Sequence, residues 1–289
     1  MRRASASAPA TRVPPRGARP PGRRSPQTNG VATSADPPSR RALLIALAGT
    51  AACGLRHAPV PTPIPRGPVR LGWRWVPGMR LVYRSLVRRR GARRLEEWTY
   101  RVEDLDAAGV ATLTGRPTGF GAAVEGLGRP ELAPLRAAER EALPSGVDLR
   151  IGLDGRLVAC SLRDFAASLP HRCLALRVPR APIAPHDVWP DTDLAWAFAD
   201  LLPTEAPPEA DVTLRLLELH HEGRHLRAAL ETEGGVRAGG GARIHLSGRA
   251  SWDPERGLLD RRTVRARFTP GDPEPHQDPG LLEVEVWAA

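Results

Sequence analysis

The sequence contains no lysine, so all 42 of its basic side chains are arginine. Together with abundant alanine, glycine and proline, this indicates GC-rich coding rather than selection for phosphate contacts. There are three cysteines and no C-x-x-C pair, which supports neither a redox motif nor a cysteine zinc site. The G-x-S-x-G elbow, the P-loop and the G-x-G-x-x-G fingerprint are absent too. None of these motifs is therefore present to predict a catalytic activity.

The apolar run at residues 42–52 is too short to cross a bilayer. As a helix it would cover roughly 16 Å, whereas a hydrocarbon core is about 30 Å thick. Arg40 and Arg41 precede the run, and small residues lead from it to Cys53. This layout is typical of an export signal. We therefore expect residues 39–52 to be a signal peptide. The alternatives are a buried helix, an uncleaved signal without lipid, or cleavage after Ala52 to give a soluble periplasmic protein.

Two resemblances concern this segment. The sequence Thr50-Ala51-Ala52-Cys53 resembles the lipobox of bacterial lipoproteins, with Thr50 where leucine is usual. That resemblance implies that Cys53 is lipidated, that residues 1–52 are removed, and that acyl chains anchor the protein to a membrane. The sequence around Arg40 and Arg41 resembles a twin-arginine export motif, with Leu43 where phenylalanine is common. Together they imply a lipid-anchored location in the cell envelope, on the periplasmic or outer-membrane face.

The net charge of +10 suggests nucleic-acid binding until its position is considered. Residues 1–52 contain nine arginines and one acid, Asp36, so they carry +8 of the total and leave +2 for the rest. We therefore expect no nucleic-acid partner. Arg88-Arg89-Arg90 with Arg93-Arg94 is the remaining basic cluster. It is predicted to be a solvated hairpin tip, and contact with anionic headgroups is the functional alternative.

The chain divides into four parts by composition. Residues 1–38 are rich in proline, arginine and serine and are predicted to be a disordered basic extension. Val31 is a candidate for the true start of translation, which would leave much of that extension untranslated. Residues 53–68 contain five prolines and are predicted to be a semi-rigid tether. Residues 69–289 are expected to form a single β-rich domain.

Strand patterns dominate from residue 69 onward. Residues 69–75, 98–103 and 282–287 alternate apolar and polar side chains, and Pro77-Gly78 and Asp154-Gly155 are turn sequences. Helices are predicted at 130–142, 162–169 and 193–202, with an extended loop at 177–190. These signals predict a mostly β fold: an antiparallel curved sheet, half-barrel or sandwich with a few short helices, preceded by the disordered segment and signal helix.

A further resemblance rests on three features: Trp75-Val76-Pro77-Gly78, the proline-rich loop that ends in Asp187-Val188-Trp189, and the paired strands of residues 242–268. These resemble uncharacterised bacterial β-rich lipoproteins with a curved sheet or half-barrel. The resemblance implies that the concave face binds an apolar ligand, such as a lipid or acyl chain, or an envelope protein.

The segment His221-Glu222-Gly223-Arg224-His225 matches the zinc-hydrolase motif H-E-x-x-H. On a helix, His221 and His225 would bind zinc and Glu222 would activate water. We favour a hairpin, because Gly223 costs about 1 kcal/mol inside a helix, Arg224 places a charge where such motifs are uncharged, and no third ligand is well placed. A weak surface metal site that includes His220 is another alternative.

Three smaller groups complete the candidates. Cys160 and Cys173 are an even pair that could form a disulfide in an oxidising compartment, although two independent buried thiols are favoured. The aspartates at 187, 191 and 193 could bind calcium, but a solvated turn is favoured. Trp189 and Trp196 are expected to fill the core, and Gly239-Gly240-Gly241 to form a turn.

Taken together, these patterns predict an exported, lipid-anchored envelope protein that binds an apolar ligand or a protein partner without catalysis or cofactor. A zinc-dependent hydrolase that uses Glu222 is the competing prediction.

Overall fold

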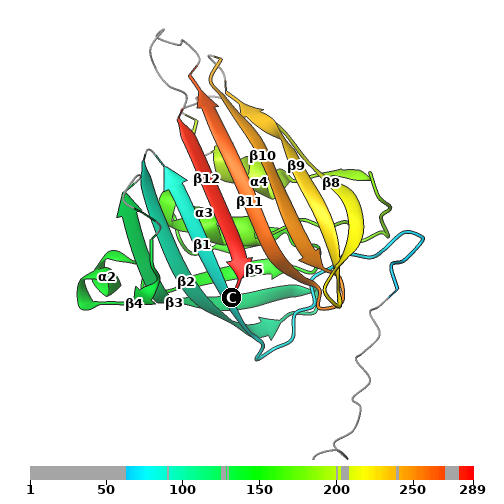
Figure 1. The fold of residues 1–289 in the computed structure, drawn as a ribbon, viewed down its shortest axis with the longest axis horizontal. Coiled ribbons are helices and arrows are strands. Elements are labelled where there is room, and N and C mark those ends of the chain that lie inside the picture. The colour runs from blue at the N-terminus through cyan, green and yellow to red at the C-terminus, as the bar shows by residue number, and fades with distance from the viewer. Residues whose placement is uncertain are drawn as a thin grey trace, which may run out of the picture. The chain divides into compact units, whose positions relative to one another are not determined.

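Twelve strands form one open, curved antiparallel sheet (Figure 1). The computed structural model describes residues 63–89, 91–124, 128, 130–199, 201–202, 208–238, 241–270 and 280–289. The predicted extension, signal peptide and most of the tether lie outside this described part of the chain. The predicted fold class is confirmed as a mostly β, antiparallel curved sheet with short helices.

The described strands are β1 (Arg80–Arg89), β2 (Ala92–Leu105), β3 (Val110–Val124), β4 (Ala133–Pro134), β5 (Val147–Gly152), β6 (Leu157–Cys160), β7 (Val188–Pro190), β8 (Glu209–Glu222), β9 (His225–Arg237), β10 (Arg243–Asp253), β11 (Leu258–Thr269) and β12 (Leu281–Ala288). The helices are α2 (Ala137–Ala142), α3 (Phe165–Leu174) and α4 (Thr192–Ala199).

The strand order is β6-β5-β3-β2-β1-β12-β11-β10-β9-β8-β7, with β4 paired to β3. Most neighbours are also consecutive along the chain, so hairpins build each half of the sheet. The two halves meet where β1 pairs with β12, in a register that runs from Tyr83 opposite Ala288 to Arg89 opposite Leu282. The first and last of the described strands therefore lie together in the middle of the sheet. The short strands β6 and β7 end its two sides, and the short strand β4 lies at a further edge beside β3. Short edge strands limit pairing with other chains.

The two faces of the sheet differ in character. Trp98, Tyr100 and Val102 of β2 are buried on the concave face, as their alternation predicts. The convex face carries cross-strand ion pairs, including Arg84 with Glu97 at 2.9 Å and Arg265 with Glu283 at 3.5 Å. Opposite charges placed across neighbouring strands stabilise a solvated sheet face. The core therefore lies inside the curve.

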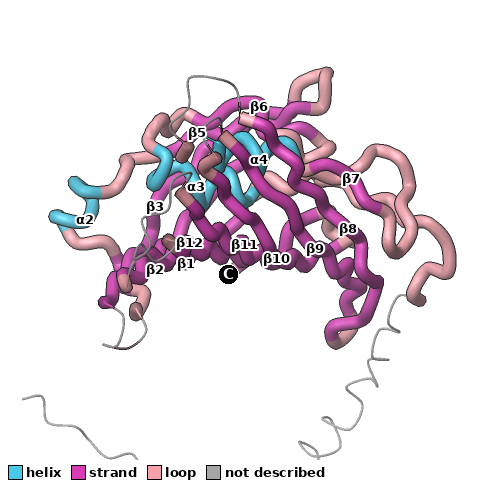
Figure 2. The backbone as a smooth tube through the Cα atoms, turned by 90° about the horizontal axis from the view of Figure 1, so that it is seen from above, coloured by secondary structure: helices cyan, strands magenta, loops and turns pink. Residues whose placement is uncertain are grey.

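Helices α3 and α4 lie within the arch of the sheet, as Figure 2 shows from above. Helix α3 contacts β11 and β12, and α4 contacts β8 and β9. Asp164 caps α3 by accepting a hydrogen bond from the Ala167 amide at 2.8 Å. Two helices of the protein thus occupy the centre of its own concave face.

Two predicted elements differ from the structure. Residues 69–75 form an extended strap outside the sheet, because the backbone amides of Trp73 and Arg74 donate to the carbonyls of Leu153 and Gly257 at two turns. The predicted helix at 130–142 is only α2, because Pro134 keeps Ala133 extended and paired in β4. The helices predicted at 162–169 and 193–202 are confirmed as α3 and α4 with shifted ends.

One buried ion pair joins the helices to the sheet. Arg262 of β11 and Asp191 are both fully buried, and their side chains are hydrogen-bonded. Arg262 Nη1 also donates to the Ala175 carbonyl at the end of α3, at 3.0 Å. Asp191 Oδ1 accepts from the Leu194 amide in the first turn of α4, at 3.3 Å. One arginine thus ties the end of α3 to the beginning of α4 on the concave face.

We expect Arg262→Met to lower the free energy of unfolding by about 3–5 kcal/mol, because it leaves Asp191 charged and buried without a partner. Arg261→Met is the matched control: its side chain is 62% exposed beside Glu285, so the loss should stay below about 1 kcal/mol. The double variant Arg262→Met/Asp191→Leu should recover part of the loss. Urea unfolding measures all three, and equal losses for the two arginines would contradict this role.

Candidate functional site

A cleft of about 750 Å³ remains at one end of the concave face, where α3 does not fill the curve. It lies between the tip of the β1–β2 hairpin, the end of β3, the beginning of β12 and the first turns of α3. Its walls are apolar and include Val87, Phe120, Phe165, Leu169 and Leu282. Ligand pockets are typically about 300–1,000 Å³ and mostly apolar, so this cleft has the size and character of one.

Small side chains produce this space. Ala92, Ala122 and Ala123 line the cleft from β2 and β3, and Ala166 lines it from α3. Ala122 lies opposite Arg94 in the register of β2 and β3, and its side chain is exposed in the cleft rather than packed. A run of small residues at the end of β3 is the sequence signal that could have indicated the cleft. These alanines were not among the residues predicted from the sequence to form a site.

Arginines border the cleft. The described members of the basic cluster, Arg88, Arg89, Arg93 and Arg94, lie at the tip of the β1–β2 hairpin, as predicted, with Gly91 at a φ of 77°. Strand alternation divides its members between the two faces. Arg88 pairs with Glu283 on the convex face, whereas Arg89 and Arg94 lie on the concave side and line the cleft. Arg93 lines the cleft as well.

Arg94 is held in place by two partners. Its Nε lies 3.0 Å from Glu96 Oε1, and its Nη2 donates to the Ala166 carbonyl at 3.1 Å. That carbonyl is four residues before Pro170, which has no N–H to donate to it. A proline inside α3 thus frees a backbone acceptor, and Arg94 occupies it and fixes the helix beside the cleft.

A buried polar group lies behind Arg94. Glu96 is 2% exposed and accepts a hydrogen bond from Trp98 Nε1 at 3.0 Å. The Tyr100 hydroxyl lies 2.6 Å from His171 Nδ1, and the His171 ring meets Trp98 edge-on at 4.5 Å. Burial, with a contribution from Arg94, lowers the pKa of His171 to about 3. Burial also raises the pKa of Tyr100 well above its usual value. Both groups are therefore neutral near pH 7.

The H-E-x-x-H segment is a hairpin tip, as predicted. Strand β8 ends at Glu222, β9 begins at His225, and the two residues pair across the turn. Gly223 has a φ of 62°, which suits a turn. The helix that a zinc-hydrolase motif requires does not form over residues 214–230. Among the described residues, no group of three or more histidine, cysteine or carboxylate side chains is arranged to bind a metal.

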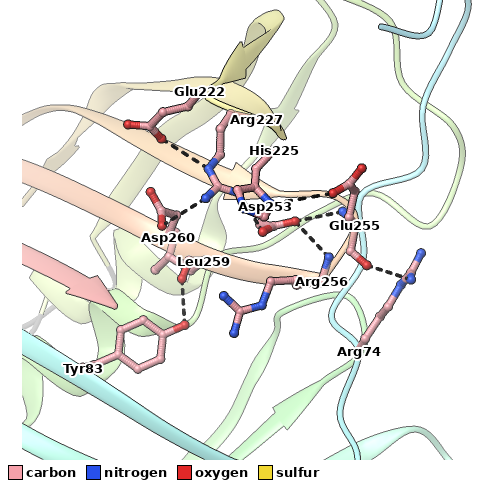
Figure 3. A network of polar contacts seen from close by, with 10 residues as sticks. All are labelled: Arg74, Tyr83, Glu222, His225, Arg227, Asp253, Glu255, Arg256, Leu259 and Asp260. Atoms are coloured by element: carbon pink, nitrogen blue, oxygen red, sulfur yellow. Dashed lines mark hydrogen bonds and ion pairs between the residues drawn. The ribbon is translucent and has the colours of Figure 1, made fainter. Parts of the chain in front are cut away.

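Glu222 and His225 instead belong to a polar network that joins two hairpin ends (Figure 3). Its centre is Arg227, whose Nη1 donates to Asp253 Oδ2 at 2.6 Å. The same guanidinium lies 3.4 Å from Glu222 Oε2 and 3.8 Å from Asp260 Oδ1. His225 Nδ1 lies 4.0 Å from Glu255 Oε2.

The network also fixes the turn after β10 and the strap. Asp253 Oδ1 accepts from the amides of Glu255 and Arg256 at 3.0 and 2.9 Å, which closes the β10–β11 turn. Arg74 of the strap donates to the Glu255 carbonyl at 2.9 Å, and Tyr83 donates to the Leu259 carbonyl at 2.7 Å. These contacts give the segment a structural role in fixing the hairpins and the strap.

The remaining candidates are separate. Cys160 and Cys173 are both free thiols in this structure, and Cys173 is buried whereas Cys160 is only partly buried. Cys160 ends the edge strand β6, whereas Cys173 lies buried in α3, where burial raises its pKa to about 11. Lipidation at Cys53 and the export role of Arg40 and Arg41 lie outside the described residues.

Two smaller predictions need correction. Asp191 is fully buried against Arg262 rather than in a solvated turn. Asp193 accepts from the Leu157 amide at 2.8 Å, and its pKa is raised by burial. Trp189 is buried as expected, but Trp196 is 52% exposed, because it lies on the side of α4 opposite the buried residues Leu194 and Phe198.

Comparison with known proteins does not assign the chain to a family. No family model and no curated protein matches the chain. One solved structure that matches is a Bacteroides fragilis protein that has been proposed to be exported and has a YmcC-like fold. It is 10% identical, with 75% of this chain and 97% of that chain covered, at a TM-score of 0.27. A similarity of this size supports no inference about function. Within the described residues, no helix has the length and apolar character needed to span a bilayer.

The network predicts unequal roles for its carboxylates. Asp253→Ala should lower the free energy of unfolding by about 3 kcal/mol, because it removes the nearest and most buried partner of a largely buried guanidinium and opens the turn. Glu222→Gln should cost less than about 1 kcal/mol, since that side chain is 68% exposed. Thermal and urea unfolding compare the variants. A larger loss for Glu222→Gln than for Asp253→Ala would contradict the central role of the Arg227–Asp253 pair.

Proposed function

We propose that this protein is exported and lipid-anchored at Cys53, and that its domain holds the hydrocarbon part of an apolar ligand in the cleft between α3 and the β1–β3 end of the sheet. The observation that carries the proposal is the cleft itself: about 750 Å³ of unfilled space with mostly apolar walls beside α3. The proposed role is to bind this ligand, either at the membrane surface or while it passes between the membrane and a partner protein.

The anchor follows from the sequence. A run of eleven residues, 42–52, is too short to stay in a bilayer as a span and ends at a cysteine in a lipobox-like context. Two or more acyl chains on Cys53 would give stable attachment, at about 0.8 kcal/mol per buried methylene. The proline-rich residues 53–68 would then act as the tether that holds the domain off the membrane surface.

The ligand chemistry follows from the cleft walls. Burying apolar surface is favourable by about 0.8 kcal/mol per methylene, so a chain of several methylenes gains several kcal/mol between Phe120, Phe165 and Leu169. The cleft is flanked by strands and by a helix fixed through Arg94, so its shape exists before the ligand arrives. A pre-formed site avoids part of the ordering cost of binding.

The anchor is tested by feeding cells a radioactive fatty acid and isolating the protein. The full chain should carry label and sediment with membranes. Cys53→Ala should carry none and should leave the membrane fraction, because the sulfur that forms the thioether bond is gone. Unlabelled wild-type protein that still begins well before residue 53 would contradict the anchor.

The binding clause is tested with decanol, a neutral probe, and the full chain carrying Cys53→Ala so that no attached lipid competes. Ala122→Trp should abolish decanol binding in calorimetric titration, because the indole fills the space that the alanine leaves open. Ala210→Trp is the matched control, since Ala210 is an exposed alanine at the start of β8, far along the strand order. Decanol binding that survives in Ala122→Trp would contradict the assigned cleft.

A further inference from the structure

The cleft has a charged mouth as well as apolar walls, and the charge is of one sign. Arg89 and Arg94 lie on its concave side, and no acidic side chain is among the described residues that line it. Glu96, buried behind the lining, neutralises Arg94. Arg89 is exposed and makes no ion pair or side-chain hydrogen bond with any described residue.

The register of the hairpin brings these two arginines together. Arg89 lies opposite Ala92, and Val87 lies opposite Arg94, so Arg89 and Arg94 are diagonal neighbours on one face. Diagonal positions on paired antiparallel strands are about 7–8 Å apart, which long side chains can bridge. The small Ala92 between them leaves the space open. Two guanidinium groups can therefore reach one group at the mouth.

The Arg94 guanidinium is oriented before any ligand binds. Its Nε faces Glu96 and one Nη2 hydrogen points to the Ala166 carbonyl, and its side chain is 35% exposed. An arginine has five N–H donors, so donors remain after these contacts. A fixed guanidinium loses less entropy when it binds a carboxylate or phosphate.

We infer that the ligand is a single-chain anionic amphiphile, with its hydrocarbon chain in the cleft and its acidic headgroup, carboxylate or phosphate, between Arg89 and Arg94. This inference rests on the proposed function and deepens it, because it specifies the headgroup. One cleft is thus lined by hydrocarbon walls and by the arginine pair, which matches a molecule with one apolar end and one acidic end. Charge-assisted hydrogen bonds to a carboxylate or phosphate are stronger than neutral ones.

The test compares four probes with the same tail: decanoate, decyl phosphate, decanol and decylamine, each below its micelle concentration, with the full chain carrying Cys53→Ala. Decanoate or decyl phosphate should bind about tenfold more tightly than decanol, and decylamine more weakly than decanol. The tighter of the two anions identifies the headgroup. Added salt should weaken the anions and leave decanol unchanged.

Two variants assign the effect to Arg89. Arg89→Gln should remove most of the anion preference without changing decanol affinity, and Arg89→Glu should make decylamine bind more tightly than decanoate. Arg88→Gln is the matched control, because it removes the neighbouring arginine on the opposite face, where Glu283 pairs with it. The Arg88→Gln variant should prefer decanoate and decyl phosphate over decanol by the same factor as the parent chain.

The outcomes separate the two proposals. Equal affinity for decanoate and decanol, or an equal loss in Arg88→Gln and Arg89→Gln, overturns the headgroup assignment while the cleft remains an apolar site. If none of the four probes binds, the proposed function fails, and the headgroup inference fails with it.

Discussion

The buried ion pair between Arg262 and Asp191 is the constraint on which the interior depends. An arginine in the middle of a concave sheet face is costly unless its donors are satisfied. Here the Nη1 and Nη2 groups donate to carbonyls at the end of α3 and to the carboxylate of Asp191, and the buried Nε has no partner among the described residues. Because Asp191 also caps α4, the two helices must lie where this one side chain reaches both. The curved sheet is therefore filled from within by its own helices.

That arrangement also sets where an opening remains. The Arg262 contact holds the end of α3, while its first turns lie near the β1–β2 hairpin, where Arg94 contacts Ala166. At the Arg94 end of α3, several side chains of β2 and β3 that line the cleft are small: Ala92, Ala122 and Ala123. The cleft is the volume that a helix fixed at both ends and an alanine-rich sheet corner cannot fill. Its location follows from the packing of α3 rather than from a separate binding loop.

The sequence predicted the parts of the fold that depend on local pattern. Alternation identified the strands, and Gly223 with its flanking charges favoured the hairpin over a zinc-binding helix, as the structure confirms. Residues 69–75 were harder to assign from the sequence. Alternation indicates which side chains are buried, but it does not indicate which partners the backbone hydrogen bonds have. Asp191 was misjudged for a related reason. Its partner is 71 residues away, and no local pattern indicates so distant an arginine.

The central claim is that a hydrocarbon chain occupies the cleft at the α3 end and no other part of the concave face. Intermolecular nuclear Overhauser effects from bound decanoate to methyl-labelled protein test it most directly. The account predicts contacts with the methyl groups of Ala122, Leu169 and Leu282. Contacts with Leu214 or Leu246 in the interior between the helices and the sheet, or with none of these methyl groups, would contradict it.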